Sequence, residues 1–216
     1  DWLVPYFNGE PRLNKPPMNY WLTGLVAGLA GALPDVSPGH ARGVSVLAGL
    51  GTLLLCLHLG AVLYGRQTAL LAGLVLVSSA GYFSFTHDAR PDLLYAFFTS
   101  LTYVAAVHVL RTTETSRMPL APLLLWFGLA AATLTKGPHM PALALVGLYL
   151  HAALGTRTLR GPLRALRVWP GLVIAAVPVL AWWGWLRLQL DPAVFTHSQL
   201  AGTLLTPVWS RLGDPY

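Results

Sequence analysis

The chain has 216 residues, of which 55% are hydrophobic and only 10% are charged. About a quarter of the residues of a soluble domain are charged, so this composition excludes an ordinary soluble protein and indicates a membrane protein. The net charge of +6 does not indicate nucleic-acid binding, because the arginines are scattered singly between apolar runs and form no basic face. The single Cys56 excludes an internal disulfide and a CxxC metal site.

Apolar runs of the right length predict a bundle of membrane helices. A hydrocarbon core of about 30 Å requires roughly 17 to 25 apolar residues per helix. The stretch from Met18 to Leu33 is apolar and Gly-rich but marginal in length, so we predict an interfacial or re-entrant helix there. About six candidate spans follow, at residues 43–64, 68–86, 92–110, 120–135, 138–154 and 168–187. The expected fold is therefore all-α, a polytopic helical membrane protein.

The loops predict the orientation of these spans. Four arginines lie in the short loop 155–167, which places that loop in the cytoplasm because Lys and Arg concentrate on the inner side. Alternation then puts seven of the eight acidic residues outside and only Glu114 inside. We expect an extracytoplasmic loop over 1–42, a transmembrane bundle over 43–187 and the start of another outer loop over 188–216. The chain has no initiator Met and no closing element, so we expect it to be a fragment of a larger protein.

The stretch Asn14-Lys15-Pro16-Pro17 places a cation on a stiff backbone. A residue before proline is excluded from the helical region, and each proline has a fixed φ, so Lys15 is held extended. An ammonium at a membrane surface suits a lipid phosphate. The simpler alternative is an interfacial lysine beside the aromatic pair Tyr20 and Trp21.

A second polar group precedes the run 92–110. Arg90-Pro91-Asp92 stands at the head of this span, directly after His87 and Asp88. Asp92 alone is also explained as a favourable charge at a helix N-terminus. Both polar groups lie outside in the predicted topology, so we expect them to converge on one face.

Three motifs together carry a family resemblance. The opening segment, Asp1-Trp2-Leu3-Val4-Pro5 with Asn8-Gly9 and residues 14–22, resembles the first outer loop of the lipid-carrier-dependent GT-C glycosyltransferases. These membrane enzymes include lipid A aminoarabinose transferases and protein O-mannosyltransferases. Ala89-Arg90-Pro91-Asp92 resembles the family's Arg-x-Asp, and Leu134-Thr135-Lys136-Gly137-Pro138 its Leu-Thr-Lys-Gly-Pro.

The resemblance implies transfer of a sugar from a polyprenyl phosphate to a lipid or protein acceptor. Such a reaction needs a cation for the departing phosphate and a carboxylate for the acceptor's proton. Lys15 is expected to supply the first, assisted by Arg90, and Asp92 to hold Lys15 in place. The family's base precedes the Asp-Trp that opens this chain, so we expect the base upstream of Asp1. The remaining candidates for substrate binding are Tyr20, His87, Asp88, Lys136 and His197.

The resemblance also sets expectations for cofactor and location. It implies no definite cofactor and leaves a divalent metal open, although Asn14 stands where many relatives have a Glu. The expected partners are a polyprenyl-phosphate-linked sugar, an acceptor and the membrane, with no nucleic acid. The expected location is the bacterial inner membrane, with the active site outside.

Two other classes of protein compete with a transferase. A transporter or flippase should carry ionisable groups in the middle of its spans, where this sequence is nearly free of charge. A membrane scaffold without chemistry would require neither a proline-braced lysine nor Arg-x-Asp.

Overall fold

The computed structural model describes residues 2–4, 6–7, 10–11, 13, 15–110, 120–156 and 167–190. This part of the chain is nearly all helical, as predicted, apart from one short antiparallel hairpin that pairs β1 with β2. The elements are β1 (Tyr6–Phe7), β2 (Glu10–Pro11), α1 (Met18–Leu29), α2 (Pro38–Tyr64), α3 (Arg66–Ser78), α4 (Ala80–His87), α5 (Asp92–Leu110), α6 (Ala121–Thr135), α7 (His139–Thr156) and α9 (Val168–Gln189).

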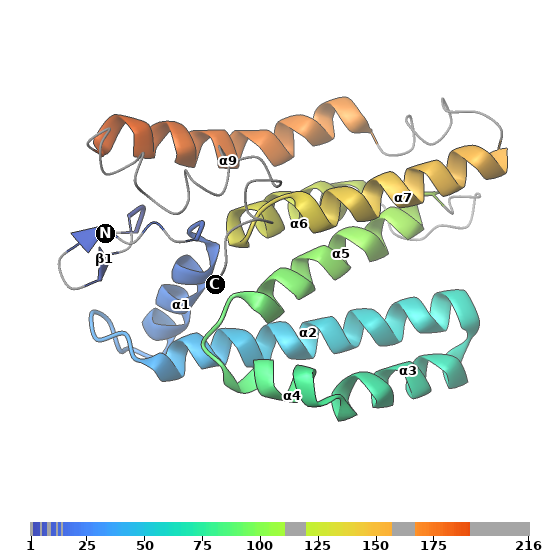
Figure 1. Cartoon of the computed structure of the whole chain (residues 1–216), viewed down its shortest axis with the longest axis horizontal. Coiled ribbons are helices and arrows are strands. Elements are labelled where there is room, and N and C mark those ends of the chain that lie inside the picture. The colour runs from blue at the N-terminus through green and yellow to red at the C-terminus, as the bar shows by residue number, and fades with distance from the viewer. Residues whose placement is uncertain are drawn as a thin grey trace, which may run out of the picture.

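The longer helices form a bundle whose members run back and forth between two ends (Figure 1). α5 packs between α2 and α6, and α6 also packs on α9. One end of the bundle holds α1, the α4–α5 loop (residues 88–91) and the α6–α7 turn (residues 136–138). We call it the motif end, because the described parts of all three sequence motifs lie there.

The six predicted spans are confirmed only in part. Within the described residues, three helices are long and apolar enough to cross a membrane, namely α2, α5 and α9. The bent pair α3 and α4 makes a fourth if it is counted as one span. α6 has 15 residues and rises only about 22 Å, short of a hydrocarbon core of about 30 Å. α1 has 12 residues, which agrees with the prediction that this segment does not cross.

The run 68–86, predicted as one span, is broken in the structure. α3 and α4 meet at a bend of 62°. Ser79 between them has an extended backbone, with φ −72° and ψ 129°. The hydroxyls of Ser78 and Ser79 donate to the carbonyls of Val75 and Leu76, three residues back in each case. Such local hydrogen bonds compete with the backbone hydrogen bonds of the helix. A hydropathy pattern does not report them, so it predicted one continuous span.

Small residues let the central helices approach closely. A Cβ on Gly128 of α6 would lie 2.6 Å from the hydroxyl oxygen of Thr102 on α5. A Cβ on Gly171 of α9 would lie 1.9 Å from the ring of Trp126 on α6. Both distances are far below van der Waals contact, so glycine is required at these crossings. The close packing sets the position of α6 and therefore of the turn that follows it.

The segment before α1 is fastened against α1 and α9. Val4 is buried in a cluster with Leu134 of α6 and with Trp182 and Leu186 of α9. The indole N–H of Trp182 donates to the carbonyl of Leu3 at 3.1 Å. Trp21 of α1 donates in the same way to the carbonyl of Trp2. Two tryptophans thus hold this segment at the motif end.

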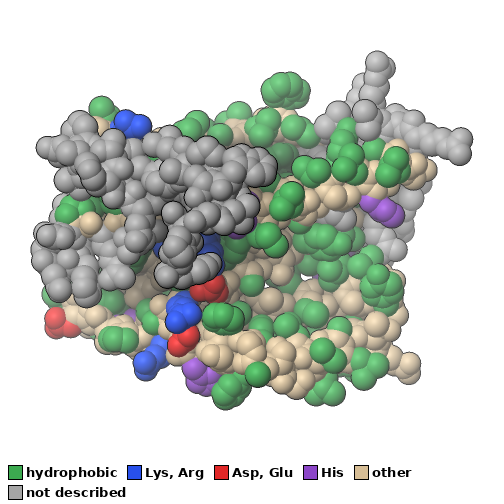
Figure 2. Space-filling model, viewed as in Figure 1, with side chains coloured by type: hydrophobic (Ala, Val, Ile, Leu, Met, Phe, Trp, Pro, Cys, Tyr) green, Lys and Arg blue, Asp and Glu red, His purple; other side chains and the backbone are tan. Residues whose placement is uncertain are grey.

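The outer surface of the bundle is apolar. Large hydrophobic side chains are exposed along α2, α3 and α9, including Leu54, Leu71 and Leu180. Figure 2 shows hydrophobic side chains spread over the visible described surface, with acidic and basic ones gathered on one part of it. An exposed apolar belt of this extent is typical of helices that face lipid. The chain is an integral membrane protein.

Candidate functional site at the motif end

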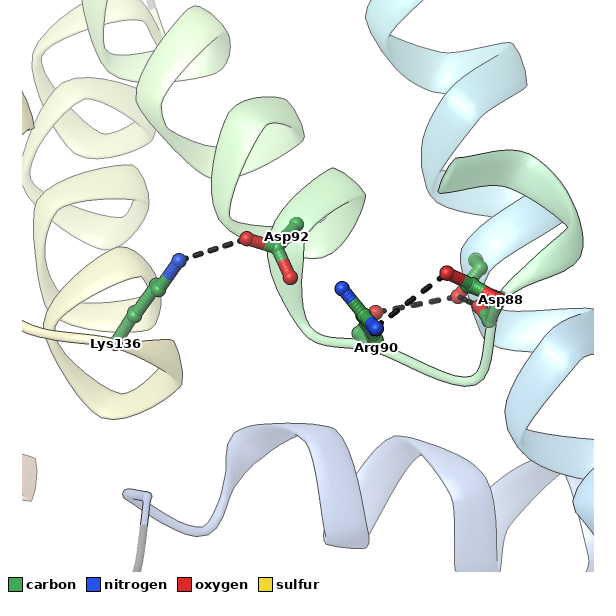
Figure 3. A network of polar contacts seen from close by, with 5 residues as sticks. Asp88, Arg90, Asp92 and Lys136 are labelled. Carbon is green, nitrogen blue, oxygen red and sulfur yellow. Dashed lines mark hydrogen bonds and ion pairs between the residues drawn. The ribbon is translucent and has the colours of Figure 1, made fainter. Parts of the chain in front are cut away.

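An ion pair joins two of the sequence motifs. The Lys136 Nζ atom donates to Oδ1 of Asp92 at 2.7 Å (Figure 3). Asp92 is the first residue of α5, and Lys136 directly follows the last residue of α6. The two side chains are 33% and 32% exposed, so the pair is partly shielded from water. The contact connects Arg-x-Asp with Leu-Thr-Lys-Gly-Pro across 44 residues.

The pairing differs from the sequence-based expectation, which assigned Asp92 to hold Lys15. The Asp92 carboxylate binds Lys136, and Lys15 makes no ion pair within the part of the chain that the structure describes. The physical reason is the close crossing of α5 and α6, which delivers the end of α6 directly to the head of α5. In the structure, Asp92 is therefore paired with Lys136 and not with Lys15.

The α4–α5 loop is anchored from α2. The buried Ser45 hydroxyl donates to the carbonyl of Asp88 at 2.7 Å and lies 3.3 Å from the carbonyl of Arg90. The side chains of Asp88 and Arg90 form a second ion pair, with Nε and Oδ2 3.4 Å apart (Figure 3). Arg90 is 64% exposed in this pair, so its guanidinium stays available to an anion.

Lys15 is exposed at the same end of the bundle. Pro17 is fully buried, and its carbonyl accepts the amide of Trp21 at 3.0 Å, which anchors the stiff backbone next to Lys15. Met18 packs against two apolar clusters that contain Leu93 of α5 and Leu134 of α6. The prediction that Lys15 and Asp92 belong to one end of the fold agrees with this packing.

One residue that the sequence analysis missed organises the α6–α7 turn. The hydroxyl of Tyr95 donates to the carbonyl of Gly137 at 2.9 Å and accepts the amide of Met140 at 3.2 Å. His139 Nε2 lies 3.4 Å from the same hydroxyl. Tyr95 stands three residues after Asp92, on the same face of α5. The three-residue spacing from Asp92 was the only sequence feature that could have identified Tyr95 as part of the site. A tyrosine inside an apolar run is usually explained by packing alone.

Two other predicted site residues, His87 and Tyr20, lie at this end of the bundle. His87 ends α4, and its Nδ1 lies 2.9 Å from the carbonyl of Phe83, so the ring is turned toward its own helix. Tyr20 lies half-buried in the first turn of α1. Asn14 and His197 lie outside the described residues. In the described ranges, no three His, Cys, Asp or Glu side chains come together as a metal-binding group would require.

Comparison with known sequences identifies the family. The family profile described as dolichyl-phosphate-mannose-protein mannosyltransferase matches residues 14–185, well over half of the chain. An uncharacterized protein of Aquifex aeolicus (strain VF5) is 34% identical over 143 residues, covering 64% of this chain and 26% of that protein. A second one from the same organism is 32% identical over 151 residues, covering 69% and 32%.

Comparison with solved structures shows the same fold. ArnT from Cupriavidus metallidurans in the apo state superposes with a TM-score of 0.74 at 24% identity, covering 92% of this chain and 36% of ArnT. The same protein bound to undecaprenyl phosphate gives 0.72 at 24% identity, covering 88% and 34%. The chain thus spans about a quarter to a third of the relatives that it matches. The motifs, the GT-C helical fold and the matched profile agree that the chain belongs to the dolichyl-phosphate-mannose-protein mannosyltransferase family of GT-C glycosyltransferases.

Proposed function

We propose that the protein transfers a sugar from a polyprenyl-phosphate donor and that the donor phosphate binds at the motif end. The observation that carries this proposal is the division of charge there. Lys136 is neutralised by Asp92, whereas Lys15 is exposed and has no ion-pair partner among the described residues. An unpaired cation on an anchored backbone is suited to a lipid phosphate at the membrane surface. ArnT, whose fold this chain shares, has been crystallised with undecaprenyl phosphate.

Arg90 is the second cation that we assign to the phosphate. Its pair with Asp88 is long, at 3.4 Å, and largely exposed, so it contributes little to stability. A phosphate oxygen offers a stronger, charge-assisted partner to the planar guanidinium. Lys136 would complete the binding surface from the α6–α7 turn while staying paired with Asp92.

The proposed reaction is a displacement at the anomeric carbon of the sugar. The acceptor's nucleophilic atom forms a bond to this carbon as the bond from carbon to phosphate oxygen breaks. The phosphate leaves with the electron pair, and the cations stabilise the charge that develops on it. The acceptor's proton passes to a base. Asp92 is a poor candidate for that base, because its Oδ1 atom already accepts a hydrogen bond from Lys136 Nζ at 2.7 Å, so we place the base elsewhere in the protein.

The placement of charge favours a transferase over a transporter or flippase. Within the described helices, Asp, Glu, Lys and Arg occur only near helix ends, such as Arg42 in α2, Asp92 in α5 and Arg187 in α9. A transport pathway would place such groups near the middle of the membrane. Both ion pairs of the described residues, Asp88–Arg90 and Asp92–Lys136, instead lie at the motif end.

The arginine-rich loop 155–167 supports an extracytoplasmic position for the motif end, because basic loops stay in the cytoplasm. That loop connects the ends of α7 and α9 that lie away from the motif end. We accordingly propose a bacterial inner-membrane enzyme that acts on a lipid or protein acceptor outside the cytoplasm.

The test is donor cleavage by the complete protein in lipid nanodiscs. Polyprenyl-phosphate-linked mannose and aminoarabinose are supplied separately with cell-envelope acceptors, and release of polyprenyl phosphate is measured by mass spectrometry. Lys15→Ala should lower the release by about 100-fold, as expected for loss of a group that stabilises the leaving charge. Lys15→Arg should recover only part of it, because a planar fork does not replace a compact ammonium.

Arg42→Ala is the matched control, since Arg42 is an exposed cation near the start of α2. Its release of polyprenyl phosphate should equal that of the unchanged protein. Equal losses in both variants would mean that surface charge in general, and not Lys15, binds the donor. Donors that stay intact while crossing the bilayer of proteoliposomes would replace the transferase with a flippase.

A further inference from the structure

We infer that Tyr95 is a positioning residue, which holds Lys136 against Asp92 by fastening the α6–α7 turn to α5. Its importance for catalysis rests on the proposed function, whereas its effect on Lys136 is a property of the fold. The Tyr95 side chain is buried, with 8% of its surface exposed, and its hydroxyl reaches two backbone groups of the turn.

The two backbone groups are ones that the helices themselves leave without partners. Met140 is the second residue of α7, and the first amides of a helix have no intrahelical acceptor. The Gly137 amide bonds to the carbonyl of Ala132 at 3.4 Å, whereas the Gly137 carbonyl lies between α6 and α7. One hydroxyl serves both, because it has a donor hydrogen and acceptor lone pairs. Without it, both groups would have to find other partners or stay unsatisfied.

The turn is a sharp one in which Lys136 has left the helix. Gly137 has φ +128°, a region that favours glycine, and Lys136 has φ −150° and ψ −15°. On the α6 side, the amides of Lys136 and Gly137 both bond to the carbonyl of Ala132, at 3.0 and 3.4 Å. The Tyr95 hydroxyl supplies the hold from the other side, through the neighbouring Gly137.

The first turn of α5 thus receives the α6–α7 turn at two points. Asp92 binds the Lys136 ammonium, and Tyr95, three residues later on the same face, binds the backbone that carries it. A lysine has a long and flexible side chain, and forming an ion pair costs conformational entropy. Fixing the backbone of Lys136 reduces this entropy cost. Loss of the hydroxyl should therefore weaken the Lys136–Asp92 pair although neither charge is changed.

The direct test is the chemical reactivity of Lys136 in the complete protein. Brief acetylation with acetic anhydride, followed by peptide mass spectrometry, compares Lys136 with the exposed Lys15 in the same molecule. The contact with Asp92 occupies the Lys136 Nζ atom and partly shields it from the reagent, since the side chain is only 32% exposed. Tyr95→Phe should raise the Lys136 to Lys15 labelling ratio by about fivefold, the effect of losing one net hydrogen bond.

Tyr82→Phe is the matched control. The Tyr82 hydroxyl on α4 also donates to a glycine carbonyl of a neighbouring helix, that of Gly49 on α2. Among the described residues, the side chains of Asp92 and Lys136 pair with each other and not with Tyr82. Its labelling ratio should equal that of the unchanged protein. An unchanged ratio in Tyr95→Phe, or an equal rise in both variants, would overturn the inference.

Donor cleavage provides the second readout and separates the two proposals. Tyr95→Phe should lower the release of polyprenyl phosphate by about tenfold, and should cost almost nothing more when Lys136→Ala is already present. Independent, multiplying losses would overturn the inference that Tyr95 acts through Lys136. If the unchanged protein cleaves no donor, the proposed function fails, while the labelling ratio still decides the role of Tyr95.

Discussion

The Asp92–Lys136 pair allows a quantitative test of how the bundle is held at the motif end. Asp92→Asn and Lys136→Met each remove one charge and keep a side chain of similar size. Because the two atoms are 2.7 Å apart, their attraction is about 6 kcal/mol at an effective dielectric constant of about 20. Each side chain is about one-third exposed, so lost hydration and solvent screening cancel most of this. We expect a net coupling of about 1 to 2 kcal/mol.

The assay is a double-mutant cycle on the free energy of unfolding, measured by tryptophan fluorescence in mixed micelles. Each single variant should lose about 1 to 2 kcal/mol, and the double variant should lose little more than either, since all three remove the same pair. Lys15→Met is the control. Its loss should add to that of Asp92→Asn, because Lys15 is not the partner of Asp92 in the structure. Strict additivity between Asp92→Asn and Lys136→Met would refute the pair, and coupling of Asp92 to Lys15 would restore the tether that the sequence suggested.

Three further predictions concern the rest of the fold. Single cysteines at Ala89 and at Tyr64, introduced after replacement of Cys56, should be labelled by an impermeant maleimide from opposite sides of the membrane. Labelling of both positions from one side would contradict the arrangement in which α2 spans the membrane. Ser45→Ala should destabilise the protein by about 1 kcal/mol and speed hydrogen exchange in the α4–α5 loop, which it anchors, whereas unchanged exchange would mean that the loop is held otherwise. Gly171→Leu should lower the free energy of unfolding by about 1 to 3 kcal/mol or more, because the leucine side chain would overlap the ring of Trp126. A variant as stable as the unchanged protein would exclude the close crossing of α6 and α9.

The sequence by itself was sufficient for the class of protein and for most helices. Long apolar runs predict membrane helices because unsatisfied backbone groups are excluded from lipid, and α2, α5 and α9 fall within a few residues of their predicted ranges. It also identified the head of α5, since a proline followed by an acidic residue favours a helix start. The bend at Ser79 was not predicted, because a hydropathy pattern reports only how apolar a segment is and contains no information on hydrogen bonds from serine hydroxyls to the backbone.

Only the tertiary structure decided which cation meets Asp92. The sequence places Lys15, Arg90 and Lys136 at one end of the bundle, and nothing local distinguishes the partner. The choice depends on how closely α5 and α6 cross, which is set by Gly128 packing against Thr102 a few turns away from the pair. The role of Tyr95 has the same origin, because its partners lie 42 and 45 residues later in the chain. Contacts of this kind follow from the packing of whole helices, and a one-dimensional pattern does not contain them.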